Sequence, residues 1–105
     1  MKRGEVWWAE MPPPAGRRPV LLLSRDEAYA VRNLVTVAPV TTRIRGIPTE
    51  VILGPHDGLP KACVVNLDVI TTIEKAYLRD RLIQLNPAKL RAVDDAIHFA
   101  LQIEH

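Results

Sequence analysis

The sequence predicts a small, mainly β fold that is closed by one C-terminal helix, and three observations predict it. The chain has 105 residues, enough for one hydrophobic core. Nine prolines and five glycines impose many turns, which favours a β-rich fold over a helical bundle. Only the last segment shows sustained helical spacing of apolar residues. We therefore expect residues 1–105 to form a single domain.

Strand signals follow one another along the chain. The aromatic and β-branched content of Glu5–Met11 predicts a first strand. The triple proline Pro12–Pro14 cannot continue a sheet, so we expect a loop that ends with Arg17 and Arg18. The short apolar run Val20–Leu23 is typical of a strand buried on both faces. Four further strands are expected at Leu34–Thr41, Thr49–Leu53, Ala62–Asn66 and Val69–Ile73.

The connecting segments are less uniform. In Ser24–Ala30 we expect a brief helical turn, with Ser24 as its N-cap and Glu27 as the N3 partner of a capping box. The turn-rich stretch Gly54–Pro60 requires no functional explanation. Leu78–Leu85 is compatible with a short helix followed by a short strand.

The C-terminal segment predicts a clear helix. Asn86 is a suitable N-cap, and Pro87 occupies the first helical position, where its missing N–H costs nothing. The helix should run to about Gln102 and pack against the sheet through an apolar stripe formed by Leu90, Val93, Ile97 and Leu101.

Composition limits the classes of function. No stretch approaches the roughly 20 apolar residues that cross a bilayer. The N-terminus lacks an apolar run of signal-peptide length, so we interpret it as mature protein. The single cysteine, Cys63, allows no internal disulfide, which makes the cytoplasm the expected compartment.

Positive charge is concentrated in Gly16–Arg45. This segment holds six of the fourteen basic residues and only two acids, so its charge of +4 exceeds the net charge of +2 of the whole chain. A basic strand–loop–strand unit on a mildly acidic body is the pattern expected for a phosphate-rich partner.

Several catalytic chemistries have no sequence support. There is no glycine-rich phosphate loop or dinucleotide-binding pattern, and one cysteine with three scattered histidines cannot form a four-ligand zinc site. We expect His56, His98 and His105 to be surface residues and Cys63 to be a small core residue. No metal or cofactor is therefore expected.

Three motifs in order resemble the MazF/PemK toxins of bacterial toxin–antitoxin pairs. They are Arg3–Trp7 (RGEVW), Arg18–Ser24 (RPVLLLS) and Val37–Thr42 (VAPVTT). The similarity continues through Pro48–Val51 and Val64–Asp68 into the closing helix. No single motif is specific, but the ordered set covers nearly the whole chain.

The resemblance implies a fold and an activity. The implied fold is a small, strongly curved antiparallel sheet of SH3-like barrel type, shared by CcdB-like and MazF-like proteins. The implied activity is that of a homodimeric, sequence-specific endoribonuclease that cuts single-stranded mRNA without a metal. The implied partner, besides RNA, is an antitoxin whose disordered tail lies across the RNA groove.

The resemblance also implies site residues. Arg18 and Thr41 match the catalytic arginine and threonine of the family, and Asp68 matches an acidic position that some members use as a base. A charged, planar guanidinium suits an anionic phosphorane, because it forms paired hydrogen bonds to phosphate oxygens. The residues expected to bind RNA are Arg17, Arg25, Thr42, Arg43, Arg45 and Asn66.

Two departures keep other functions open. Asn66 and Thr71 stand where relatives have basic residues, so either the site relies more on Arg18, or Arg17 or Arg25 compensates. One alternative is therefore a degenerate relative that binds RNA without cutting it. The other is a non-enzymatic, CcdB-like poison that binds a protein, although the basic segment favours RNA.

Overall fold

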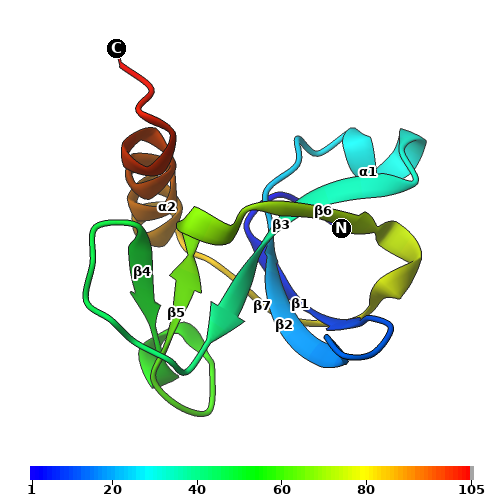
Figure 1. Cartoon of the computed structure of the whole chain (residues 1–105), viewed down its shortest axis with the longest axis horizontal. Helices are drawn as coiled ribbons and strands as arrows, with labels where there is room; N and C mark the ends of the chain where they lie inside the picture. The colour runs from blue at the N-terminus through cyan, green and yellow to red at the C-terminus, as the bar shows by residue number, and fades with distance from the viewer. Residues whose placement is uncertain (105) are drawn as a thin grey trace.

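The structure is a computed structural model that describes residues 1–104 as a curled antiparallel sheet with one helix beside it (Figure 1). It confirms the mainly β class with a C-terminal helix. His105 lies outside the described residues. No helix within the described residues is long and apolar enough to span a membrane. The strands are β1 (Glu5–Glu10), β2 (Arg17–Leu22), β3 (Leu34–Thr41), β4 (Glu50–Leu53), β5 (Cys63–Asn66), β6 (Thr71–Glu74) and β7 (Leu78–Gln84).

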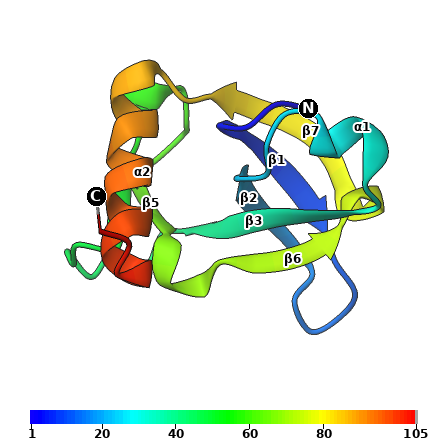
Figure 2. The same cartoon turned by 90° about the horizontal axis from the view of Figure 1, so that it is seen from above.

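Strand β3 connects the two halves of the sheet. Residues Leu34–Val37 pair with β6, and Val37–Pro39 pair with β2. On the edge opposite β2, the last two residues, Val40 and Thr41, pair with β5. The strand order is therefore β4-β5-β3-β2-β1-β7, with β6 attached to β3. Figure 2 shows β1, β2, β3, β6 and β7 curling around one interior, while β5 lies against the C-terminal helix.

Apolar side chains fill both faces of the central strands. In β2, Leu21 belongs to one buried cluster, while Val20 and Leu22 belong to another. In β3, Val35 and Val37 face the second cluster, while Ala38 and Val40 face the first. The alternation follows from the two-residue period of a strand. It confirms a strand buried on both faces for Val20–Leu22, whereas Leu23 follows the strand and is half-buried.

The C-terminal helix α2 (Pro87–Leu101) covers the β4–β5 side of the sheet (Figure 1). As predicted, Asn86 is its N-cap, and the Asn86 side chain accepts a hydrogen bond from the Lys89 N–H at 2.8 Å. Leu90, Val93 and Ile97 pack against the first cluster. Leu101 was expected to continue this stripe, but it is 58% exposed, because the last turn extends beyond the sheet.

The N-terminal turn packs against α2. Gly4 has φ of +93°, a conformation that favours glycine, and a Cβ at this position would lie 2.7 Å from Leu90 Cδ2, so the Leu90 side chain would have to shift. The guanidinium of Arg3 reaches the Asp94 carboxylate at 2.7 Å. These contacts attach the N-terminal turn to the first half of α2.

Local sequence signals misassigned three segments. The short helix α1 (Ala28–Val31) has Glu27 as its N-cap, because the Ser24 hydroxyl is used elsewhere and accepts a hydrogen bond from the Thr36 N–H at 2.8 Å. The predicted capping box is therefore wrong. Arg17 and Arg18 begin β2 instead of ending a loop. Leu78–Gln84 is one strand, preceded by a 3-10 turn at Lys75–Tyr77.

A buried carboxylate stabilises the start of β1. Glu5 is only 5% exposed. One of its oxygens accepts hydrogen bonds from the Lys2 N–H at 2.8 Å and from Trp7 Nε1 at 3.1 Å, and the other accepts from Arg81 Nη1 at 3.2 Å. Burial alone raises the pKa of Glu5, but these hydrogen bonds outweigh it, and the pKa is lowered from 4.5.

We predict that Glu5→Gln destabilises the protein at neutral pH. A pKa that is lower in the folded than in the unfolded state stabilises the fold above the unfolded value, and this contribution is lost as the pH falls through the folded value. The variant should melt roughly 5 °C below the wild type at pH 7, and the difference should shrink below about pH 4. Thermal melts between pH 3 and pH 8 measure it.

Glu10→Gln is the matched control, because Glu10 forms an exposed ion pair with Arg79 that should contribute little to stability. Equal melting temperatures of Glu5→Gln and wild type at pH 7 would contradict the interpretation of the Glu5 network.

Candidate active site

The candidate site lies where the β2–β3 ladder ends, a point called the fork below. The last pair between β2 and β3 is Val20 with Pro39. The same register continued by two residues would set Arg18 opposite Thr41. The Leu23 N–H donates to the Thr36 carbonyl, so after Leu21 and Ala38 the next pair to exchange hydrogen bonds would be Pro19 and Val40, and Pro19 has no N–H to donate. The β2–β3 ladder stops here, while the opposite edge of β3 pairs with β5 at Val40 and Thr41.

A cavity of about 380 Å³, the first cavity, opens at the fork. It is lined by Trp8, Arg18, Pro19, Pro39, Val40, Thr41, Thr42, Leu59, Pro60, Lys61, Cys63 and Leu82. A second cavity, of about 410 Å³, lies on the other side of Arg18 and Pro39. Its remaining lining residues are Met11, Pro14, Ala15, Val20, Val37, Val69, Thr71 and Ile73.

Arg18 lines both cavities. Its Nε donates a hydrogen bond to the Ala15 carbonyl oxygen at 2.8 Å, which fixes the guanidinium relative to the loop before β2. Within residues 1–104 its Nη atoms have no hydrogen-bond partner. The guanidinium therefore presents up to four N–H groups to a ligand in the cavities.

Thr41 brings a hydroxyl to the first cavity. Its Oγ1 accepts a hydrogen bond from the Arg43 N–H at 3.2 Å, so the hydroxyl proton remains available for donation. The structure thus brings together Arg18, Thr41 and Thr42, which the sequence singled out from two separate strands.

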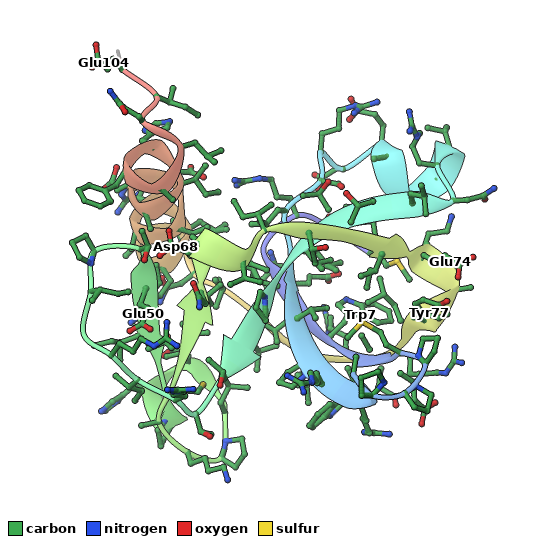
Figure 3. The ribbon with its side chains drawn as sticks, in the orientation of Figure 1. Trp7, Glu50, Asp68, Glu74, Tyr77 and Glu104 are labelled. Atoms are coloured by element: carbon green, nitrogen blue, oxygen red, sulfur yellow. The ribbon has the colours of Figure 1, made fainter. Side chains whose placement is uncertain are left out.

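The basic loop after β3 is fixed by Glu50. One oxygen of Glu50 accepts hydrogen bonds from the N–H groups of Arg45 and Gly46, both at 2.9 Å. Figure 3 shows Glu50 beside β4, on the side where this loop runs. Arg43 and Arg45 are exposed on the loop but line neither cavity beside Arg18.

Asp68 and Asn66 lie away from this pair. Asp68 Oδ2 accepts a hydrogen bond from the Thr49 hydroxyl at 2.6 Å, and the Asn66 side chain accepts one from the Asp68 N–H at 2.9 Å. Neither residue lines a cavity beside Arg18. Figure 3 shows Asp68 at the end of β5, next to α2. The geometry gives Asp68 a role in joining β5 to the start of β4, and its expected role as a base stays a prediction.

The other predicted arginines differ in position. Arg17 lies over the Trp8 ring, with its Cζ 4.6 Å from the ring centroid. Arg25 forms an exposed ion pair with Glu27, beyond the C-terminal end of β2, whereas Arg18 lies near its N-terminal end. The structure therefore does not bring Arg25 to the fork.

Sequence reasoning missed Trp8 and Lys61. Leu59, Pro60 and Lys61 line the first cavity, so the stretch we interpreted as a plain turn forms one of its walls. Lys61 adds a second cation beside Arg18, and no acid lines either cavity. The only sequence signal was a lysine directly after a turn, which does not reveal which strand the turn faces.

Cys63 also lines the first cavity but is only 6% exposed. Burial, followed by the nearby charge of Asp57, raises the pKa of its thiol. The thiol is therefore protonated at neutral pH and is not an activated nucleophile. Across residues 1–104, no group of three or more His, Cys, Asp or Glu side chains is arranged to hold a metal ion.

Residues 2–101 match the family of PemK-like, MazF-like toxins of type II toxin–antitoxin systems. The chain belongs to this family. Among its relatives, the probable endoribonuclease MazF5 of Mycobacterium tuberculosis is 45% identical over 100 residues, covering 94% of this chain and 91% of the relative. EndoA, an endoribonuclease of Bacillus subtilis, is 31% identical over 111 residues, covering 98% of this chain and 96% of the relative.

Solved structures agree with the assignment. The M. tuberculosis toxin MazF-mt6 superposes with a TM-score of 0.88 at 32% identity, over 96% of this chain and 99% of that chain. An endoribonuclease from a mycobacterial species, solved in complex with its cognate antitoxin, has a TM-score of 0.87 at 31% identity, over 100% of this chain and 98% of that chain. The predicted family, the curled-sheet fold and the endoribonuclease class are thereby confirmed.

Proposed function

We propose that this MazF-like toxin cleaves single-stranded RNA at short specific sequences without a metal ion, with the scissile phosphate bound between Arg18 and Thr41. The observation that supports the proposal is that Arg18 and Thr41, from neighbouring strands, line the same cavity at the fork. The cavities around them hold cations and hydroxyls but no carboxylate. Such a lining suits a phosphate anion better than it suits a divalent cation.

The proposed step uses the nucleophile of the substrate itself. The ribose 2′-oxygen attacks the adjacent phosphorus as it loses its proton, and the bond from phosphorus to the 5′-oxygen breaks. The leaving 5′-oxygen takes up one proton, which balances the proton lost from the 2′-hydroxyl, so the products are a 2′,3′-cyclic phosphate and a 5′-hydroxyl. The pentacoordinate phosphorane carries more negative charge than the phosphodiester, so pre-positioned donors accelerate the step.

Arg18 supplies this stabilisation in the proposal. Its Nε already donates a hydrogen bond to the Ala15 carbonyl oxygen, and this bond orients the two Nη groups before the substrate arrives. An arginine is a poor proton donor, because the guanidinium group holds its proton so tightly. Its main contribution is therefore electrostatic, while the Thr41 hydroxyl donates to the same phosphate.

Cleavage of a long single-stranded RNA in excess EDTA tests the proposed activity. We expect full activity, together with products that end in a 2′,3′-cyclic phosphate and begin with a 5′-hydroxyl. Loss of activity in EDTA that magnesium or manganese restores would contradict the metal-independent step. RNA that is bound but never cut would identify the chain as a degenerate relative.

We predict that Arg18→Ala slows single-turnover cleavage of a cognate oligonucleotide by about 10²–10³-fold or more. Arg18→Lys should recover little, because an ammonium keeps the charge but loses the planar pair of donors. Thr41→Val removes only the hydroxyl and keeps the β-branched shape, so its effect should be smaller.

Two comparison variants accompany this series, and the melting temperature of each variant separates chemistry from folding. Arg91→Ala removes one exposed positive charge on α2 and should leave cleavage unchanged. Asp68→Asn keeps an acceptor for the Thr49 hydroxyl, so a large loss of rate at an unchanged melting temperature would identify Asp68 as the base. Near wild-type cleavage by Arg18→Ala would refute the assignment of Arg18.

We further propose that the active form is a homodimer restrained by an antitoxin that covers the RNA groove. Apolar side chains remain exposed on β4 and α2, among them Ile52 at 59% and Phe99 at 63%, which supports a second copy as their cover. Sedimentation at micromolar concentration should give twice the chain mass. A monomer under these conditions would count against the dimer.

A further inference from the structure

The first cavity is built for a flat apolar group with a polar edge. Its walls are apolar and include an indole, from Trp8, and three prolines, Pro19, Pro39 and Pro60. Its polar side chains are Thr41, Thr42 and Lys61, together with Arg18. A nucleobase has this composition, because its faces are π surfaces and its edges carry hydrogen-bond donors and acceptors.

Trp8 is held in place by its neighbours in the sheet. It pairs with Pro19 across β1 and β2, and Arg17 is its diagonal neighbour on the same face of these strands. The Arg17 guanidinium covers the indole at 4.6 Å from the ring centroid, within cation–π range. Arg17 does not line the first cavity, so the part of the indole that faces the cavity is not covered by it.

Arg18 connects this indole to the chemistry. It lines the first cavity with Trp8, but it also lines the second cavity, which contains no aromatic residue. A phosphate held by Arg18 therefore has an aromatic surface on one side and aliphatic and proline side chains on the other. Nucleotides on the two sides of the scissile phosphate thus meet different environments.

We propose that Trp8 binds, by stacking in the first cavity, one of the two nucleobases that flank the scissile phosphate. This inference rests on the proposed ribonuclease function. The base lies on the indole surface that Arg17 leaves open, so that guanidinium, indole and base form three layers. The ammonium of Lys61 and the hydroxyl of Thr42 border the same space and contact the edge of the base. In this role, Trp8 is a substrate-binding residue that contributes to the preference for particular RNA sequences.

Abasic substitution combined with mutation of Trp8 tests the proposal. Single-turnover kcat/KM is measured on a cognate oligonucleotide with an abasic nucleotide at either position flanking the cleaved bond. For wild type, we expect a loss of about 10–100-fold at one of these positions, as for other base–aromatic stacks. Trp8→Leu should lose a similar factor on intact RNA and nothing more on that abasic RNA, while Trp8→Phe keeps most of the activity.

The opposite flanking position provides the internal control, because Trp8 does not line the second cavity. There, abasic substitution should slow wild type and Trp8→Leu by the same factor. The proposal would be overturned if abasic substitution slowed wild type and Trp8→Leu by the same factor at each of the two flanking positions, because Trp8 would then be uncoupled from both bases.

A second measurement avoids variants of Trp8. Trp7→Phe leaves Trp8 as the only tryptophan of the chain. An oligonucleotide with a 2′-deoxyribose at the cleavage site cannot be cleaved, and its binding should quench the fluorescence of Trp8. An abasic substitution at one of the two flanking positions should remove the quenching while binding persists. Unchanged fluorescence on saturation would overturn the proposal. Because this readout needs no turnover, it stays separate from a failure of wild type to cut RNA, which would refute the proposed function itself.

Discussion

The end of the β2–β3 ladder at Val20 and Pro39 is the constraint on which the site depends. A strand that remained paired with β2 along its whole length would bring Thr41 into a closed ladder with Arg18. Instead, the pairing stops two residues earlier, where Pro19 has no N–H to donate, while β5 holds Val40 and Thr41 from the opposite edge of β3. The opening between the strands thus arises from backbone geometry, not from the removal of bulky side chains.

Packing on both sides makes this opening rigid. The first apolar cluster holds β3 and β5 against α2, and the second fills the interior of the curled sheet. Because each cluster uses alternate residues of the same strands, the register cannot shift by one residue without exchanging the two cores. Arg18 and Thr41 are therefore placed by buried residues that never touch a ligand.

The sequence predicted some parts of the structure well and others not at all. Strong patterns, such as the Val20–Leu23 run and the Asn86–Pro87 helix start, predicted their elements because one local cause dominates each. Ser24 was misassigned because its hydroxyl serves a residue twelve positions away. Arg18 and Thr41 were found through a resemblance to relatives. Trp8 and Lys61 were not found, because a local pattern does not say which loop closes over which strand.

Glu50 has a consequence for how members of such a family diverge. It holds the loop after β3 through the backbone N–H groups of residues 45 and 46, which every residue except proline possesses. The path of the loop therefore makes few demands on the side chains of Arg43 and Arg45. Substitutions there can alter what the loop presents to a nucleic acid while its course is retained, so new sequence preferences can arise on an unchanged scaffold.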